Sequence, residues 1–554
     1  MADYNLEMPT CRDIDIRDLS IAQLQEHMVA GTFSAWDLTA CFLERVKRVN
    51  GILKAIIEVN PDALSIAAER DEERRRGHRR GPLHGIPFVV KDNIATRDKM
   101  ETTAGSRVLV GTVVPEDALV VSKLREAGAV LLGHSNLSEW ACMRSSYYSE
   151  AYSSRGGQCR NPHNLAQHPG GSSSGSAVAV AASMCAFGIA TETDGSTPQV
   201  IYPADRNGVV GLKPTVGSTS SRGIIPESRH LDVVGPIAKT VTDAAVVTSV
   251  IMGQTLEDGP ETPLESFVAT KAALRGARFG MPKKRLWESA ANASVKKFQY
   301  EALLRVIERI RDAGAVVTDN TDISSGEDII APDKWDWDYP GHPTESELTV
   351  VKTDFYNDIR DYLANLAANP RNIRSLEDII AFNREHADEE GGLPGRHDAW
   401  PTGQDVFEQS AATRGVEDET YRQALEFIRR KSRSEGIDAA LSDDEGPLDG
   451  LAVPVQAESG LANQVAAKAG YPMITIPVGR DQNGVPFGIA LMQTAGREDL
   501  LVKYGSAIED LVGMRPRPEF RNPEADDYMY VGIKPDSEQM IKRKSYIYGE
   551  RRSL

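Results

Sequence analysis

The sequence predicts an α/β fold with a large hydrophobic core. Short apolar runs typical of buried strands alternate with helical patterns along most of the chain, which is the order of elements found in α/β proteins. The composition is that of an ordinary globular protein, with 41% hydrophobic and 26% charged residues. A chain of 554 residues can bury such a core in one large domain or in two.

In the first part of the chain, helices and short strands follow one another closely. Ser34 is expected to cap the second of two helices, because a serine oxygen can accept a hydrogen bond from a free helix N–H group. The apolar run that precedes Lys91 predicts a strand that carries this lysine into a buried position. The expected elements are helices within 17–49 and over 118–127, and strands over 86–90 and 130–133.

In the middle of the chain, a run of small and apolar residues from Ser176 to Phe187 predicts a helix that packs closely in the core. This helix would begin just after a glycine- and serine-rich stretch, so that its positive N-terminal end points at that stretch. Farther along, we expect a strand within 272–282, an amphipathic helix over 294–313 and a strand at 315–317.

Residues 323–440 differ from the rest of the chain, since they are rich in acidic residues and helical patterns. Their aromatic residues are candidates for substrate contact, although packing between helices explains each one equally well: Trp335, Trp337, Tyr339, Phe355, Tyr356 and Tyr362. Strand patterns return at 474–478 and 487–491, on either side of a turn at 481–484. After about residue 522 the sequence is charged and irregular.

Three segments carry residues suited to nucleophilic chemistry. Ser172 lies in the run from Gly170 to Ser176, which consists only of glycine and serine. Ser196, 24 residues farther along, ends the stretch Thr193-Asp194-Gly195-Ser196. Lys91 ends the apolar strand upstream. Because such a site contains no histidine, the lysine would take the proton that a histidine takes in the commoner hydrolases.

Each residue type in these segments meets a physical need. A serine hydroxyl is a weak nucleophile until a neighbouring base accepts its proton. Lysine can be that base only when it is neutral, which requires a desolvated pocket that lowers its pKa. The glycines beside the two serines allow the backbone to come close to a substrate. Successive N–H groups leading into Ser196 could stabilise an oxyanion, at about 3–4 kcal/mol for one donor.

Each segment taken alone has a more ordinary interpretation. A glycine- and serine-rich stretch is more often a loop or linker, a lysine after an apolar run usually ends a strand in solvent, and a serine after Asp-Gly usually belongs to a turn. The order, spacing and local context of the three segments together favour the nucleophilic interpretation. Two histidines near these segments, His84 and His134, are expected to form structural hydrogen bonds.

The combination resembles the amidase signature family, whose hallmark is a Ser–cis-Ser–Lys triad. The resemblance extends from about residue 20 to residue 518 and includes several specific motifs. Those motifs are 81–87 with 91–93, 136–140, 156–158, 161–162, 170–176, 193–196, 211–215, 232–236, 470–472 and 486–488.

By this resemblance, Lys91 is the catalytic base, Ser172 is the bridging serine and Ser196 is the nucleophile that becomes acylated. The bridging serine of the family lies on a cis peptide bond. The sequence allows either the Gly171–Ser172 or the Ser172–Ser173 bond to be that bond, and the resemblance favours the first.

The resemblance also implies a set of oxyanion and substrate-binding residues. The backbone before and at the nucleophile would form the oxyanion hole, and a residue just after Trp140 would line the substrate site. The implied set is Thr193, Asp194, Gly195, Ser196, Ala141 and Ser172.

The fold implied by the resemblance is a single large α/β domain over 1–522, with a central mixed β-sheet flanked by helices. Within it, residues 323–440 would form a helical, acidic and cap-like part above the catalytic core. Residues 523–554 would form an irregular C-terminal extension.

The activity implied is hydrolysis of a linear carboxamide, in a small-molecule or lipid-like substrate, through an acyl-serine intermediate. The base would draw a proton from the bridging serine as that serine draws one from the nucleophile, and the relay would later protonate the departing amine. Three alternatives stay open: an acyltransferase with the same acyl-enzyme, a catalytically impaired homologue that acts by binding, and the glutaminase component of a tRNA amidotransferase.

One departure from the family pattern lies beside the nucleophile. The family's proline follows the nucleophile after a shorter stretch, whereas here Pro203 comes seven residues after Ser196, as though three residues had been inserted. About 1 Å of misplacement can cost roughly 100-fold in rate, so a reshaped active site, an impaired site and a gene-model error are all open. Pro198 also stands where some relatives carry an arginine for acidic substrates, which weakens the case for a carboxylate bound there.

Composition and charge limit the partners. A net charge of −17 disfavours binding to nucleic acid or to an anionic membrane, and no apolar run approaches the roughly 18 residues of a membrane span. The five cysteines are scattered, which suggests neither a zinc site nor a disulfide framework. We therefore expect a cytoplasmic enzyme with a small-molecule amide substrate, no metal and no cofactor, and with a homodimer as one possible assembly.

Overall fold

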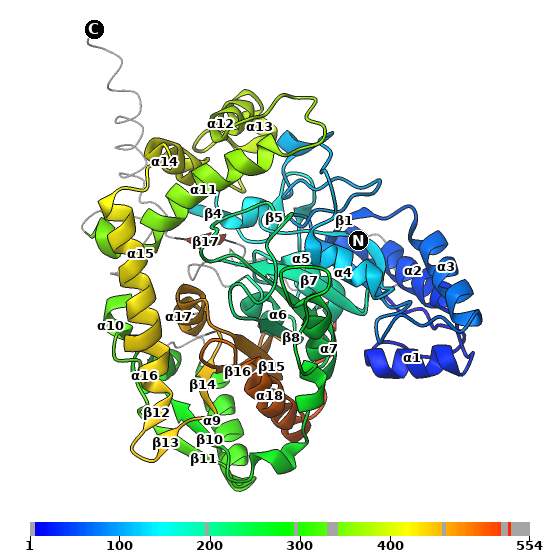
Figure 1. The fold of residues 1–554 in the computed structure, drawn as a ribbon, viewed down its shortest axis with the longest axis vertical. Coiled ribbons are helices and arrows are strands. Elements are labelled where there is room, and N and C mark those ends of the chain that lie inside the picture. The colour runs from blue at the N-terminus through cyan, green and yellow to red at the C-terminus, as the bar shows by residue number, and fades with distance from the viewer. Residues whose placement is uncertain are drawn as a thin grey trace.

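The computed structural model describes residues 6–193, 199–292, 297–329, 342–456, 461–521 and 530–532. The described residues form one central sheet of eleven strands, in the order β1-β3-β2-β7-β9-β8-β15-β16-β14-β10-β11 (Figure 1). Its strands are β1 Ile56–Val59, β2 Pro87–Lys91, β3 Val130–Ser135, β7 Phe187–Glu192, β8 Val210–Lys213, β9 Val233–Ala238, β10 Arg278–Met281, β11 Val316–Asp319, β14 Gly450–Pro454, β15 Met473–Arg480 and β16 Pro486–Met492.

Strands of this sheet pair in both directions. β2 lies between β3 and β7 and is parallel to both, and β10 is parallel to β11 and β14. The other neighbouring pairs are antiparallel. The predicted mixed sheet is therefore confirmed, and its parallel β3-β2-β7 part brings the carboxyl ends of three strands to one edge.

Helices flank the sheet, as predicted. The helix nearest its centre is α5, which packs against β2, β3, β7 and β9. Every residue of α5 is buried, because serine, glycine, alanine and valine side chains allow close contact with the strands. The helices of this part are α1 Ile21–Val29, α2 Ala35–Leu53, α3 Ala63–Arg75, α4 Leu119–Glu126, α5 Ser174–Ala181, α6 Ile201–Arg206, α7 Val241–Ile251, α8 Glu288–Asn292, α9 Lys297–Asp312, α17 Leu461–Ala469 and α18 Glu498–Val512.

Local signals in the first part of the chain were correct. The side chain of Ser34 accepts a hydrogen bond from the backbone of Asp37 at the start of α2, and Asp37 returns the contact as a capping box. The apolar run before Lys91 forms β2, whose residues are all buried. The strands expected near 130, 315, 474 and 487 are present as β3, β11, β15 and β16.

The helix expected from Ser176 to Phe187 is a correction. The helix begins two residues earlier and ends at Ala181, and Phe187 begins the strand β7. The chain reverses at Ser183, which has a φ of 57°, and Phe187 then stacks on Phe88 of the neighbouring strand. A continuous apolar run cannot distinguish the end of a buried helix from the start of a buried strand.

A second correction concerns the strand expected within 272–282. Its first part is a short 3-10 turn at Lys271–Leu274, and only Arg278–Met281 pairs in the sheet as β10. The amphipathic helix expected over 294–313 is present as α9, Lys297–Asp312, and its predicted first residues, 294–296, lie outside the described part.

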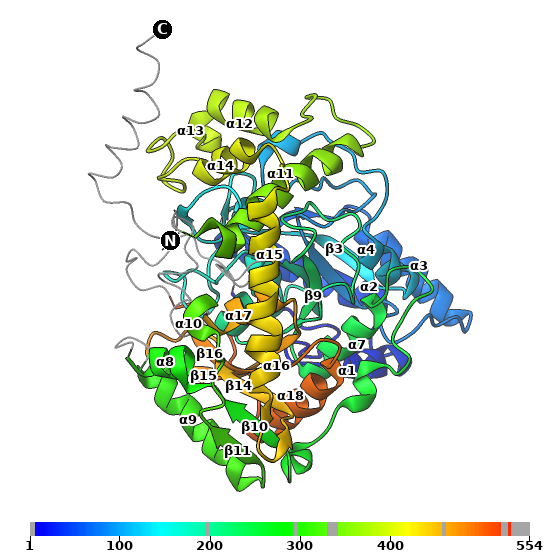
Figure 2. The ribbon, with the colours of Figure 1, turned by 60° about the vertical axis from the view of Figure 1, so that its left-hand side comes forward.

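The acidic segment forms the helical part that was expected. Helices α11 to α14 lie together at the top of Figure 1, and the long helix α15 runs from them along the core (Figure 2). The helices are α10 Gly326–Ile329, α11 Glu347–Ala364, α12 Leu376–Glu385, α13 Ala387–Glu390, α14 Asp405–Thr413, α15 Glu419–Ser432 and α16 Asp438–Ala440. We call α11 to α14 the cap.

The cap aromatics that the structure describes serve the cap itself. Phe355 is fully buried and stacks on Phe407, and the hydroxyl of Tyr356 donates to Glu377. Tyr362 packs against the same apolar cluster as Phe355. These three are helix-packing residues, and the other three aromatics, at positions 335, 337 and 339, lie outside the described residues.

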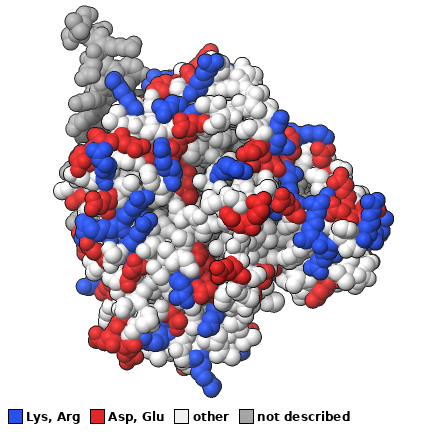
Figure 3. All heavy atoms as spheres, viewed as in Figure 1, with Lys and Arg blue, Asp and Glu red and all other residues white. Residues whose placement is uncertain are grey.

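Of the expected C-terminal extension, the structure describes 530–532, which form the short strand β17 beside β4, Tyr147–Ser149. No helix in the described part of the chain is long and apolar enough to cross a membrane. Acidic and basic side chains are interspersed over the face shown in Figure 3.

Candidate functional site

Lys91 ends β2 and is fully buried at the parallel edge of the sheet. Its side-chain nitrogen lies 2.7 Å from the hydroxyl oxygen of Ser172. The same nitrogen lies 2.8 Å from Thr191 Oγ1, at the end of the neighbouring strand β7. Asn93 donates to that threonine oxygen at 3.0 Å. The structure thus brings together two of the three residues expected to be catalytic.

Burial gives this lysine the property that a base requires. Desolvation lowers the pKa of Lys91 to about 8, while the nearby charges of Glu227, Asp232 and Glu192 oppose that change. A lysine in solvent has a pKa near 10.4. A substantial fraction of Lys91 is therefore neutral near pH 8 and can accept a proton.

Ser172 is held by the chain on both of its sides. The peptide bond between Gly171 and Ser172 is cis, which is the bond that the family resemblance favoured. The carbonyl of Ser172 accepts a hydrogen bond from the Ser138 backbone at 3.0 Å. A Cβ atom on Gly171 would collide with the side chains of Glu150 and Ser138. This position therefore requires glycine because a carboxylate and a hydroxyl lie against its backbone.

Thr193, the last described residue before the predicted nucleophile, is fixed by two carboxylates. Its hydroxyl donates to Asp232 at 2.6 Å and to Glu227 at 3.2 Å. Asp232 also accepts the backbone N–H groups of Glu227 and Ser228, each at 3.1 Å. Burial raises the pKa of Asp232 to about 7.

The chain on the far side of the predicted nucleophile is held by the same groups. Gln199 donates from its amide nitrogen to Glu227 at 3.2 Å and to the carbonyl of Ala141 at 3.3 Å. The carboxylate of Glu192 accepts the N–H groups of Val200 and Ile201, at 2.7 and 3.1 Å, where α6 begins. Glu227 therefore contacts residues on both sides of the segment 194–198.

Ala141, expected to line the substrate site, lies in a tight turn at Glu139–Cys142. Trp140, Ala141 and Cys142 all have positive φ, and Ala141 is almost fully buried. Its carbonyl contacts Gln199, as described above, so the turn lies against the segment that follows the predicted nucleophile.

The remaining predicted residues, Asp194, Gly195 and Ser196, lie outside the described residues, as do Thr197 and Pro198. The predicted role of Ser196 and most of the predicted oxyanion hole stay predictions. Of the complete set, the structure describes Lys91, Ser172, Thr193 and Ala141.

Sequence reasoning missed two residues of this site. Thr191 contacts Lys91 directly, and strand alternation could have found it, because residues 191 and 193 fall on one face of a strand that leads to Ser196. Glu227 lies in an irregular loop with no motif, and no sequence signal pointed to it. Its contacts to Thr193 and Gln199 appear only in three dimensions.

The two histidines of the motif regions form the structural contacts that were expected. His84 Nε2 contacts the carbonyl of Arg70 at 2.9 Å. The ring of His134 bridges Asp92 and Thr96, at 2.8 Å each. The five cysteines are all buried and free. Among the described residues, no group of three or more His, Cys, Asp and Glu side chains is placed to hold a metal ion.

Most of the chain matches known amidases in sequence. The sequence model of the family described as Amidase matches residues 37–331. A Schizosaccharomyces pombe protein named as an amidase is 50% identical over 529 residues, which cover 93% of this chain and 88% of that protein. The chain belongs to the amidase signature family. It is an enzyme that hydrolyses amide bonds.

The fold is also that of a solved amidase. The X-ray structure of native peptide amidase from Stenotrophomonas maltophilia matches with a TM-score of 0.79 and 38% identity, over 91% of this chain and 99% of that chain. The predicted amidase signature fold is thereby confirmed. A component of the glutamyl-tRNA(Gln) amidotransferase from Chloroflexus aurantiacus is 38% identical over 309 residues, but this match covers only 55% of the chain and 61% of that component.

Proposed function

We propose that this amidase cleaves a carboxamide through an acyl-enzyme on Ser196, with Lys91 as the base and Ser172 as the proton relay. The observation that carries the proposal is the 2.7 Å contact between the Lys91 nitrogen and the Ser172 hydroxyl in a fully buried setting. A lysine whose pKa is lowered to about 8 can take a proton at this distance. Family membership supports the same assignment.

The reaction would proceed in two stages. Lys91 takes the proton of Ser172 as Ser172 takes that of Ser196, and the freed Ser196 oxygen attacks the amide carbonyl carbon. When the carbon–nitrogen bond breaks, the same proton returns through Ser172 to the departing amine. Water then attacks the acyl-serine ester, and the carboxylic acid leaves. Backbone N–H groups ending at Ser196 would stabilise the oxyanion in both stages.

The substrate is proposed to be a small-molecule or lipid-like carboxamide. The likeness to a peptide amidase at 38% identity supports including peptide amides in the first substrate panel. One alternative has a specific observation in its favour. The three additional residues between Ser196 and Pro203 favour a catalytically impaired homologue that acts by binding.

Labelling with a fluorophosphonate, which traps activated serines, tests the proposal. Peptide mass spectrometry would locate the label in the wild type and in Lys91→Ala and Ser172→Ala. Lys99→Ala is a matched control, because Lys99 is exposed and pairs with Asp62 on the surface. We expect label on Ser196 in the wild type and the control, and strongly reduced label in the two site variants.

Either of two results would count against this function. Label on a different serine would remove the assigned nucleophile. A folded wild type that stays unlabelled would favour the impaired homologue, and sequencing of the transcript across residues 196–203 would then show whether the additional residues are expressed. Where Ser196 is labelled, adding hydroxylamine with an amide substrate would reveal acyl transfer as a hydroxamate product.

A further inference from the structure

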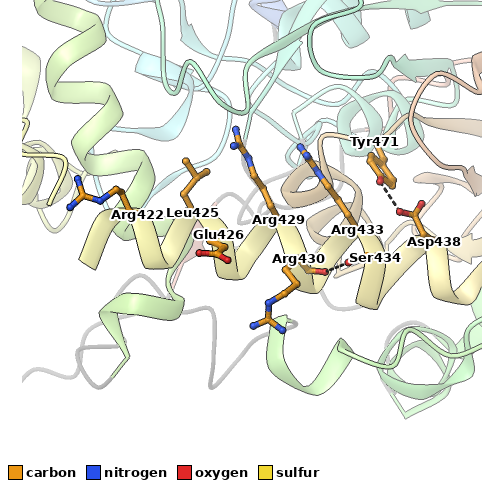
Figure 4. A pocket seen from close by; sticks show the side chains of 9 residues that line it. All are labelled: Arg422, Leu425, Glu426, Arg429, Arg430, Arg433, Ser434, Asp438 and Tyr471. Carbon is orange, nitrogen blue, oxygen red and sulfur yellow. Dashed lines mark hydrogen bonds between the residues drawn. The ribbon is translucent and has the colours of Figure 1, made fainter. Parts of the chain in front are cut away.

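A second hollow lies along the outer helix α15 and its continuation, the turn Arg433–Ile437. Its volume is about 540 Å³, and four of the nine residues around it are arginines (Figure 4). None of the residues assigned to the catalytic site lines it. The concentration of guanidinium groups raises the question of what they bind.

Two of these arginines face the hollow together. Arg429 and Arg433 are one helical turn apart and point to the same side of α15 in Figure 4. Within the described part of the chain, Arg429 has no hydrogen-bond or ion-pair partner, and its Nε atom is buried. Arg433 uses its Nε atom to donate to the carbonyl of Ala469 at 2.8 Å, and its guanidinium lies 5.8 Å from the ring of Tyr471.

The other two arginines of the hollow are neutralised. Arg422 pairs with Glu419 at 3.2 Å, and Arg430 forms an ion pair with Glu435 and points away from Arg429 and Arg433 in Figure 4. Arg429 and Arg433 form no ion pair in the residues that the structure describes. The positive charge of the hollow therefore comes from these two side chains.

Two carboxylates also line the hollow. Asp438 accepts hydrogen bonds from the hydroxyls of Tyr471 and Thr494, at 2.8 and 2.7 Å, so both of its oxygens are engaged. Glu426 is exposed, where water screens its charge. Neither carboxylate forms an ion pair with the two facing arginines.

Like charges one helical turn apart repel each other. Partial burial lowers the pKa of Arg429, and the charge of Arg433 lowers it further. A guanidinium presents a planar fork of donors that matches the two oxygens of a carboxylate or phosphate. An anion between the two groups would satisfy these donors and remove the repulsion.

We propose that Arg429 and Arg433 bind the carboxylate or phosphate group of a small ligand in this hollow. The side chains of Leu425 and Tyr471 provide apolar surface for the rest of the ligand. The anionic group has two possible sources, an amide substrate with a carboxylate of its own or a free anion. The proposal goes beyond the acyl-serine chemistry and does not depend on it.

Binding of inorganic phosphate and of succinate, measured by calorimetry at low and matched ionic strength, tests the proposal. We expect saturable binding to the wild type. Because a hydrogen bond to a charged group contributes about 1.5–3 kcal/mol, binding should weaken by about tenfold or more in Arg429→Gln. Arg430→Gln is the matched control, since it removes the same charge from the same helix on the opposite side, and its binding should be unchanged.

Equal binding by all these variants, or no saturable binding by the wild type, would overturn the proposal. Arg429→Lys keeps the charge but loses the fork, so intermediate binding would support it, and unliganded melting temperatures would show that each variant is folded. The source of the anion follows from kinetics. A higher KM in Arg429→Gln only for amides that carry a distal carboxylate identifies the substrate, whereas a change in phosphate binding alone identifies a free anion.

Discussion

Lys91 and Thr191 end neighbouring parallel strands, and the side-chain nitrogen of Lys91 lies 2.8 Å from the hydroxyl of Thr191. Parallel strands place their carboxyl ends at the same edge of a sheet, so the contact follows from the topology. Asn93 donates to the same hydroxyl at 3.0 Å. The Lys91 nitrogen is therefore held between Ser172 and Thr191, and its orientation depends on a residue that takes no part in the proposed proton relay.

Thr191→Val tests that orientation. Valine keeps the shape of threonine but removes the hydroxyl, so Lys91 loses one of its two hydroxyl contacts. We expect kcat to fall by roughly tenfold, in proportion to one hydrogen bond of about 1–1.5 kcal/mol, with KM little changed. Thr191→Ser keeps the hydroxyl and should recover most of the rate. Equal rates for the valine and serine variants would show that the hydroxyl does not position Lys91.

The pH dependence of hydrolysis should report the protonation of Lys91. Its pKa is lowered to about 8, and the neutral form is the base. The value of kcat/KM for an uncharged amide should therefore rise with pH and level off above about pH 8. A profile that is flat between about pH 6 and pH 9 would contradict a lysine base with this pKa.

Glu227→Gln should move that rise to lower pH. The negative charge of Glu227 is the largest of the charges that raise the pKa of Lys91, so its removal allows burial to lower the pKa further. The hydrogen bond from Gln199 can persist, because glutamine keeps a carbonyl oxygen. Glu435→Gln removes an exposed carboxylate on α15's continuation and should leave the profile in place. A loss of rate without a pH shift would assign Glu227 a structural role only.

Much of the site could be predicted because its segments carry strong local signals. The apolar run before Lys91 has few interpretations other than a buried strand, and the glycine around Ser172 is required where side chains crowd the backbone. The limits of α5 were less predictable, since the apolar run over 176–187 includes the end of a helix, a turn and the start of a strand. Periodicity alone does not separate these three.

Contacts between distant segments could not be predicted. Glu227 meets Thr193 and Gln199 only because the loop before β9 folds over the end of β7. The pKa of Asp232 rises to about 7 because that loop is buried, which no single residue in the sequence signals. Similarly, the two arginines that face the hollow follow a helical pattern that is usually a solvated surface, and only their neighbours distinguish them from Arg422 and Arg430.

Gly171→Ala should abolish activity by disrupting the folded site. A methyl group at this position would collide with Glu150 and with the hydroxyl of Ser138, and both groups are buried. We expect a loss of roughly 3 kcal/mol or more in the free energy of unfolding, as for overpacking of a dense core. Gly259→Ala is the matched control, because no atom lies within 4 Å of its added methyl group. Melting temperatures compare the two, and equal values would refute the crowding.

Arg144→Met should destabilise the contact between the cap and the core, and more so at higher pH. Arg144 is buried, forms an ion pair with Glu139, lies 4.0 Å from Glu390 at the end of α13 and stacks 3.7 Å from the Trp400 ring. Burial already raises the pKa of both carboxyl groups. Without the cation they hold protons that the unfolded chain releases, so stability is lost as pH rises through their folded pKa values. We expect a loss of about 3–5 kcal/mol near pH 8 and less near pH 5. Arg384→Met breaks an exposed cap pair with Glu408 and should cost under about 1 kcal/mol at either pH. Chemical denaturation at both pH values measures this, and a pH-independent loss would show that the two carboxyl groups do not titrate with folding.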